Sequence, residues 1–256
     1  LNVADTENHA IRLVDFEERT VKTIAGTGNQ AMRFNASGPG LQTDLSSPWD
    51  VLLNEGSLYI AMAGTHQISK LDLNTEYVTP YAGSGREARI DGALNAAALS
   101  QPSGIATDCK TLYVADSESS SIRSVGLGPD SQVDTLAGGD LFDYGDIDGR
   151  GLKARLQHPL GVAYKNGCVY VADRYNNKIK RISLKDAYCE TIFGTGKSGY
   201  EDGGQPLFNE PGGLSFGADK LYIADTNNHV VRVADLASGY VSTLEIRRLD
   251  KLMSSA

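Results

Sequence analysis

A short pattern recurs five times along this chain and constrains its fold more than any other feature. Each copy is five residues long and mostly apolar, with Ala in the fourth position. The fifth position is Asp in four of the five copies. The copies occupy residues 1–5, 58–62, 112–116, 169–173 and 221–225, at spacings of 57, 54, 57 and 52 residues. Self-similarity at such a period marks a repeat architecture, in which one supersecondary unit is stacked until a continuous core forms.

The fourth unit shows what each repeat is expected to form. Its short apolar or alternating segments predict strands at residues 159–164, 169–172, 178–183 and 189–193. Asn166-Gly167 between the first two is a strong hairpin signal, and the continuous apolar character of the second strand predicts burial on both faces. Four short antiparallel strands at this period are typical of one β-propeller blade. The chain is therefore predicted to be all-β, without a helix of any length.

The repeats divide the chain into units with one incomplete end. We place them at about residues 1–44, 45–99, 100–156, 157–208 and 209–244, with a tail or edge strand at 245–256. The first unit begins in mid-repeat and lacks the segment that would form its innermost strand. We therefore expect the chain to be a fragment of a longer protein, with the missing part upstream of Leu1.

Composition argues against several classes of function. The formal net charge is −8, from 32 acidic and 24 basic residues, whereas binding to nucleic acid phosphates needs clustered Lys and Arg. No apolar run is long enough to cross a bilayer, so we expect no membrane insertion. The three cysteines are an odd number without a Cys-x-x-Cys pair, which favours a reducing compartment such as the cytoplasm, or inert buried thiols, over a disulfide framework.

Four of the repeat units pair their Asp with a base seven residues later. The pairs are Asp5 and Arg12, Asp116 and Arg123, Asp173 and Lys180, and Asp225 and Arg232. The second unit has Met62 and Ser69 at these places, so it loses both charges together. A buried acid without its base is costly, and joint loss therefore indicates that the two side chains form structural ion pairs.

Residues inside and between the repeats resemble the NHL repeat family. The Asn-His stretch that gives the repeat its name stands here as Asn8-His9-Ala10 and Asn228-His229-Val230. Segments that depart from the general repeat resemble a subgroup in which a thioredoxin-like domain precedes the propeller; they are residues 47–51, 60–68, 115–120, 145–149, 156–162 and 209–214.

The resemblance implies a six-bladed ring within a larger protein, with a small β domain after the propeller. It further implies a role in redox or stress response, or in phagocytosis and cytoskeletal organisation, with any redox chemistry in the absent thioredoxin-like domain. The expected partner is that domain or another protein, and no cofactor is implied for the propeller. Plant members of the subgroup would indicate the chloroplast lumen in place of the cytoplasm.

The loops that join one blade to the next are long and varied, and binding residues concentrate on such loops. The residues just before each inner-strand Pro are Ser47, Gln101, His158 and Glu210. Only the first inner strand has Asp50 where the others have Gly, and the chain's single Trp, Trp49, lies beside it. We predict a partner-binding site at the channel mouth formed by Trp49, Asp50, Gln101, His158 and Glu210; Asp50 bonding to a neighbouring strand is the alternative.

Metal and catalytic signals are weak. Asp140, Asp143, Asp146 and Asp148 crowd one loop, but Tyr144 and Arg155 stand where an EF-hand loop needs acids. His9, His66 and His229 occupy equivalent places in separate units, which favours a structural role over a shared zinc site. No Ser-His-Asp set or phosphate-binding loop can be assembled.

Three functions remain open at this stage. The first is a non-catalytic interaction scaffold whose loops bind a protein partner. The second is a metal-dependent lyase-like enzyme using the central channel, because some NHL propellers resemble such a lyase, although few His lie on the inner strands. The third is RNA binding, known for NHL propellers with basic faces, which the acidic charge opposes.

Overall fold

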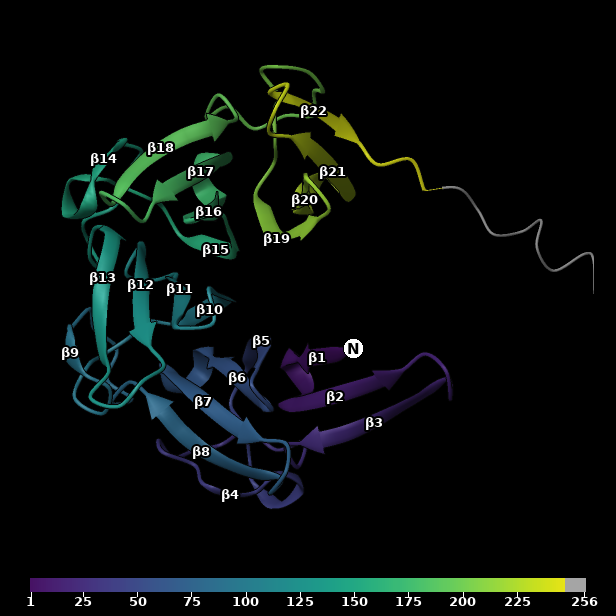
Figure 1. The fold of residues 1–256 in the computed structure, drawn as a ribbon, viewed down its shortest axis with the longest axis vertical. Helices are drawn as coiled ribbons and strands as arrows, with labels where there is room; N and C mark the ends of the chain where they lie inside the picture. Colours follow the sequence, from purple (N-terminus) through teal and green to yellow (C-terminus); the bar gives the residue numbers. More distant parts are fainter. Residues whose placement is uncertain (247–256) are drawn as a thin grey trace, which may run out of the picture.

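The computed structural model describes residues 1–246 and arranges them as five antiparallel blades around a common centre (Figure 1). The predicted all-β class and propeller architecture are confirmed, and the only helices among these residues are single 3-10 turns. None of them has the length and apolar character needed to span a membrane. Residues 245 and 246 belong to no strand, and the rest of the predicted tail lies outside the described residues.

Each blade takes its strands in chain order from the centre outward. Blade 1 has β1 (Asn2–Asp5), β2 (Ala10–Asp15) and β3 (Thr20–Ala25), and it lacks the innermost strand, as predicted. Blade 2 has β5 (Pro48–Asn54), β6 (Ser57–Met62), β7 (Gln67–Asp72) and β8 (Tyr77–Ala82). Blade 3 has β10 (Pro102–Thr107), β11 (Thr111–Asp116), β12 (Ser121–Gly126) and β13 (Gln132–Gly138). Blade 4 has β15 (Pro159–Lys165), β16 (Cys168–Asp173), β17 (Lys178–Ser183) and β18 (Tyr188–Phe193), and blade 5 has β19 (Pro211–Gly217), β20 (Lys220–Asp225), β21 (Val230–Asp235) and β22 (Tyr240–Thr243).

Blades 2, 3 and 4 carry a fifth strand that the sequence pattern did not predict. The loop entering each of these blades first runs along its outer edge as a two-residue strand, namely β4 (Gly38–Pro39), β9 (Gly92–Ala93) or β14 (Gly149–Arg150). Each pairs with the outermost long strand of the blade that follows in the chain. A strand of two residues is too short to show a hydrophobic period, so the sequence pattern does not distinguish it from a loop.

Local sequence fixes the two kinds of turn in each blade. In blade 4, Asn166 and Gly167 have φ values of 50° and 75° and close the predicted hairpin between Lys165 and Cys168. The next turn, η5 (Arg174–Asn176), ends at Asn177 in the left-handed conformation. The hairpins therefore lie at one end of the blades and the 3-10 turns at the other. We call the end with the turns and the long interblade loops the loop face, and the other end the hairpin face.

The second strand of blades 2, 3 and 4 is buried on both sides, as its apolar run predicts, whereas in β20 of blade 5 Ala224 is exposed. In β16, Val169 and Val171 belong to the core shared with blade 3, whereas Tyr170 and Ala172 belong to the core shared with blade 5. Burying both faces removes nearly all the apolar side chains of the strand from water. The hydrophobic core is thus a series of layers between neighbouring blades.

Tyrosine rings complete these layers near the hairpin face. The third residue of β6, β11, β16 and β20 is always Tyr, namely Tyr59, Tyr113, Tyr170 or Tyr222. Tyr113 stacks on Tyr164 of the next blade with ring centroids 5.7 Å apart, and Tyr170 meets Phe216 edge-on at 5.0 Å. These rings occupy the space that widens between radiating sheets.

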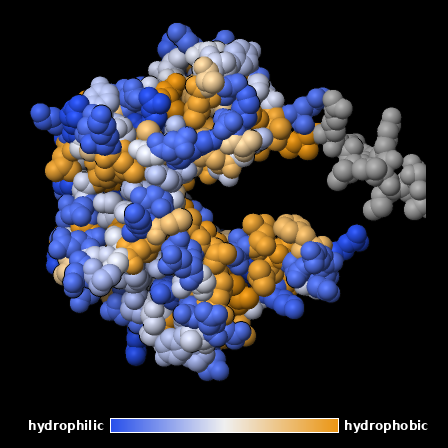
Figure 2. All heavy atoms as spheres, viewed as in Figure 1, coloured by the Kyte–Doolittle hydropathy of each residue, from blue (hydrophilic) through white to orange (hydrophobic). Residues whose placement is uncertain are grey.

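The blades form an arc that is open on one side. Blade 1 and blade 5 stand at its two ends, with open space between β1 and β19 (Figure 1). The space-filling view shows the same opening, with apolar residues along both of its edges (Figure 2). The six-bladed ring implied by the family resemblance stays a prediction.

Candidate functional site on the loop face

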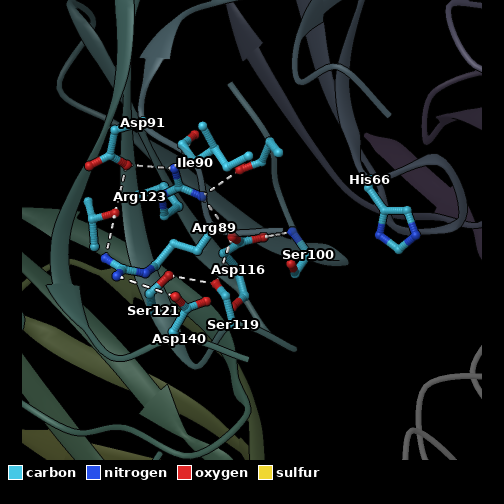
Figure 3. A network of polar contacts seen from close by, with 12 residues as sticks. His66, Arg89, Ile90, Asp91, Ser100, Asp116, Ser119, Ser121, Arg123 and Asp140 are labelled. Carbon is cyan, nitrogen blue, oxygen red and sulfur yellow. Dashed lines mark hydrogen bonds and ion pairs between the residues drawn. The ribbon is translucent and has the colours of Figure 1, made fainter. Parts of the chain in front are cut away.

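A buried base ties the entering loop to the middle of blade 3 (Figure 3). Arg123 of β12 is fully buried and donates to Asp116 of β11 at 2.9 Å and to Asp91 of the loop at 2.8 Å. It also donates to the loop carbonyls of Ala98 and Ile90. Because one guanidinium serves four acceptors, the loop is fixed against the sheet.

Blades 4 and 5 repeat this arrangement with their own residues. Arg232 donates to Asp225 at 2.8 Å and to Asp202 of the loop at 2.7 Å. In blade 4 the base is Lys180, whose Nζ lies 2.8 Å from Asp148 and 3.9 Å from Asp173. The acid–base pairs expected seven residues apart are therefore present in these blades, and each has a third member on the loop.

The loop acid of each set could have been predicted from the sequence. Asp91, Asp148 and Asp202 each precede a Gly, and they stand 32, 32 and 30 residues before their bases. Asp-Gly steps are typical of turns, and no local signal links a loop carboxylate to a strand so far along the chain. Their regular spacing from the base was the available signal.

We call the strand acid, the base and the loop acid of one blade a triad. Burial changes the pKa values of the two acids. It raises the pKa of Asp116 even though the Arg123 charge opposes this, and it raises the pKa of Asp173 to about 7. Burial would also raise the pKa of Asp91, but hydrogen bonding from Thr135 and the Arg123 charge outweigh it and lower the value. In blades 3 and 4 the pKa of the loop acid is thus lowered, whereas the pKa of the strand acid is raised.

Blade 2 has lost all three members of the triad. Gly38 pairs with Val78 of β8 as Gly92 pairs with Val133 of β13, so the loop position equivalent to Asp91 is Ser37. Met62 and Ser69 replace the strand acid and the base, and both are buried. In blade 1 the pair persists, with Asp5 and Arg12 2.9 Å apart, but both side chains are about a third exposed because no inner strand covers them.

The residue before each inner-strand Pro locks one blade to the next. Ser47, Gln101, His158 and Glu210 all have positive φ, between 47° and 56°. Their backbone N–H groups donate to the residue that ends the turn between the second and third long strands of the preceding blade. These acceptors are His9 Nδ1, His66 Nδ1, Ser120 Oγ and Asn177 Oδ1. The predicted structural role of His9 and His66 is therefore an interblade hydrogen bond, and the described histidines do not converge on one site.

Trp49 and Asp50 line a cavity of about 330 Å³ in the channel, together with inner-strand residues of three further blades. Trp49 is 42% exposed. Asp50 accepts hydrogen bonds from the N–H groups of Val51 at 2.8 Å and Ile105 of β10 at 3.0 Å. Burial raises its pKa to about 6. The carboxyl thus bridges blades 2 and 3, which is the structural alternative considered for this residue.

Glycines show why blades 3 and 4 cannot accept Asp at the equivalent positions. A Cβ added to Gly104, the equivalent residue in blade 3, would lie 2.3 Å from the Leu160 carbonyl oxygen. At Gly161 it would lie 2.2 Å from the Gly212 carbonyl oxygen. The inner strands of blades 3, 4 and 5 approach backbone to backbone there, whereas between blades 2 and 3 the Asp50 carboxyl fills the gap.

The other candidate residues lie apart from that cavity. His158 lines a second cavity of about 230 Å³ on the loop face, with Glu118, Tyr144 and Tyr175. Its ring stacks on Tyr175 at 4.7 Å, and its Nδ1 lies 3.5 Å from the Glu118 carboxylate. Burial lowers the pKa of His158, which favours its neutral form.

The five predicted channel-mouth residues are therefore divided. Gln101 and Glu210 line neither of these two cavities, and Glu210 pairs with Arg174 at 2.7 Å. Sequence reasoning missed Glu118, Tyr144 and Tyr175, because nothing in the repeat pattern indicates that residues of blades 3 and 4 and their connecting loop meet there.

The acidic loop, residues 139–148, contains four carboxylates that bind bases. Asp140 lies 3.5 Å from Arg89 and Asp143 lies 2.6 Å from Arg155, while Asp146 and Asp148 both accept from Lys180. Within residues 1–246 no group of three or more His, Cys, Asp or Glu could hold a metal ion. These ion pairs brace a loop that presents Phe142, which is 93% exposed.

The repeated blade, its interblade bonds and its Asn-His turns define the class of protein. The sequence profile of the NHL repeat matches residues 156–182, and this chain is an NHL-repeat β-propeller. It is 43% identical to human NHL repeat-containing protein 2 over 96% of the chain and 39% of that protein. It is 42% identical to the Arabidopsis thaliana protein SUPPRESSOR OF QUENCHING 1, chloroplastic, over 96% of the chain and 25% of that protein. The chain thus spans well under half the length of both relatives.

Solved structures share the fold at low sequence identity. A Bacteroides thetaiotaomicron protein of unknown function superposes with a TM-score of 0.61 at 17% identity, covering 91% of this chain and 65% of that one. Streptogramin B lyase gives 0.58 at 13% identity, over 97% of this chain and 66% of that one. At these identities the likeness concerns the propeller fold alone.

Proposed function

We propose that this chain is a non-catalytic protein-binding module that contacts its partner through the loop face. The observation that carries the proposal is Phe142, a nearly fully exposed aromatic side chain on a loop braced by ion pairs. Exposed aromatic residues on rigid supports are typical binding hot spots, since little conformational entropy is lost when they are buried.

Neighbouring residues extend the proposed surface. Tyr144 and Tyr175 are 57% and 46% exposed, and they line the cavity that also contains His158 and Glu118. An apolar centre beside a carboxylate suits a partner whose own contact residues are apolar and basic. The net charge of −8 favours the same kind of partner.

The identity of the partner is part of the proposal. The family resemblance suggests a thioredoxin-like domain of the same longer protein, or another protein in redox, stress-response or cytoskeletal pathways, in the cytoplasm. The length of the relatives supports the presence of further domains, because this chain covers only 39% and 25% of them.

The test compares a double variant on the loop face with a single control variant on the hairpin face. Phe142→Ala with Tyr144→Ala should abolish or weaken at least tenfold the binding of partners captured from cell extract and of the isolated thioredoxin-like domain of the longer protein. Phe16→Ala is the control, because Phe16 is 72% exposed but lies in the β2–β3 turn, on the hairpin face. Equal binding by wild type and the loop-face variant would contradict the proposal.

A further inference from the structure

One interblade space lacks the aromatic rings that fill the others. Asn2 of β1 pairs with Leu13 in the register by which Tyr59 pairs with Lys70 and Tyr113 with Ser124. The inner-strand position that is Tyr164 in blade 4 and Phe216 in blade 5 is Leu53 in blade 2. The space between blades 1 and 2 therefore has neither ring of the pair.

A cavity of about 740 Å³ occupies this space at the hairpin face. Five of its fourteen lining residues are leucine. Four of these, Leu13, Leu41, Leu53 and Leu73, are 36%, 58%, 55% and 38% exposed. The residues equivalent to Leu73 in blades 3 and 4, Leu127 and Leu184, pack against the interblade cores instead. Apolar surface that the other blades bury is thus left open to water here.

The shape and chemistry of the cavity indicate what would fill it. The same place elsewhere holds one or two six-membered aromatic rings, and the four leucines offer them an apolar lining. Lys22 and Glu76 also line the cavity, so a phenol hydroxyl has a cation and a carboxylate within its walls. In blade 2, Lys70 lies 6.0 Å over the Tyr59 ring, an example of the same pairing of cation and ring.

We propose that the cavity between blades 1 and 2 receives a tyrosine side chain from a partner polypeptide, in the place where the other blades use their own. The cavity lies on the hairpin face, away from the loop face to which the proposed function is assigned. The two proposals therefore stand or fall separately.

Small probes test the chemistry of the cavity. We expect p-cresol, the tyrosine side chain as a free molecule, to bind the wild-type chain saturably in an NMR titration. Asn2→Tyr restores the repeat residue, so it should weaken p-cresol binding at least tenfold and raise the melting temperature by about 2–4 °C. Asn227→Tyr is the control, because Asn227 is exposed in the 3-10 turn of blade 5, on the loop face, and should leave binding unchanged.

A second variant and two further probes complete the test. Leu53→Phe fills the cavity from its opposite wall, so it should also weaken p-cresol binding and serves if Asn2→Tyr does not fold. Equal binding of 4-methylcyclohexanol and p-cresol, or p-cresol binding untouched by both variants, would overturn the aromatic assignment. Acetyl-Gly-Tyr-Gly-amide should bind at least as tightly as p-cresol; markedly weaker binding would overturn the assignment to a polypeptide.

Discussion

At the scale of single residues, this propeller uses different side chains for the same bond. The N–H of the residue before each inner-strand Pro is accepted by His in blades 1 and 2, by Ser in blade 3 and by Asn in blade 4. All four acceptors close their turn with positive φ, a conformation that Asn tolerates particularly well. The requirement is an acceptor at this point, so the residue type can vary while the bond persists.

Replacing His66 tests the value of this bond. His66→Ala leaves the Gln101 N–H without its acceptor, and we expect the free energy of unfolding to fall by about 1–2 kcal/mol. His66→Asn should recover most of the loss, since Asn177 serves in blade 4. His229 holds the equivalent place in blade 5, where its side chain is exposed and makes no hydrogen bond within residues 1–246, so His229→Ala should change stability by less than about 0.5 kcal/mol. Urea denaturation measures all three.

The raised pKa of the Asp50 carboxyl predicts that the free energy of unfolding depends on pH. Burial raises its pKa from 3.8 to about 6, so its stabilising contribution is fully present below about pH 3.8 and is lost as the pH rises through about 6. Asp50→Asn keeps an acceptor but cannot ionise. We expect the stability of the variant relative to wild type to rise by about 2–3 kcal/mol between pH 4 and pH 7. A stability difference that stays constant across this range in urea titrations would contradict the prediction.

At the scale of the blade, the buried triad acts as a unit. Arg123, Asp116 and Asp91 are present together in blade 3, and blade 2 has Ser69, Met62 and Ser37 at the same places. A carboxylate left in the interior without its base loses the charge that offsets its desolvation. The triad can therefore be replaced whole far more easily than in part.

Copying blade 2 into blade 3 tests this cooperativity. Arg123→Ser alone should lower the free energy of unfolding by about 3–5 kcal/mol, because Asp116 would be left buried without its base. Adding Asp116→Met and Asp91→Ser should recover part of that loss, so that the triple variant is more stable than the single one. Chemical denaturation at pH 7 gives the comparison. A triple variant less stable than Arg123→Ser would show that the three residues act independently.

At the scale of the whole molecule, the open arc makes the two terminal blades unequal to the rest. Blades 2, 3 and 4 each share apolar cores with neighbours on both sides, whereas blades 1 and 5 contribute to one core each. In a repeat protein, stability is close to a sum of unit and interface contributions, so a unit with one interface opens first.

Hydrogen exchange checks this order. We expect the amides of β11 and β16 to exchange slowest and those of β2, β3, β21 and β22 to exchange fastest, with protection decreasing from the middle of the arc toward its ends. Mass spectrometry of exchanged peptides would resolve each blade. Uniform protection across the five blades would mean that the molecule opens only as a whole.

The sequence alone determined the repeat, its strands and its acid–base pairs, because these follow from a local period and from spacings within one blade. The tertiary structure decided which residues of different blades meet. Asp91 reaches Arg123 across 32 residues, and Tyr144, Tyr175 and His158 share a cavity with Glu118, although no repeat spacing connects them. The tertiary structure also placed Trp49 and Asp50 in a different cavity from His158. The position of Asp50 depends on how closely the inner strands pack around the channel. The cavity beside Asn2 became visible in the same way, because a missing ring matters only where two blades diverge.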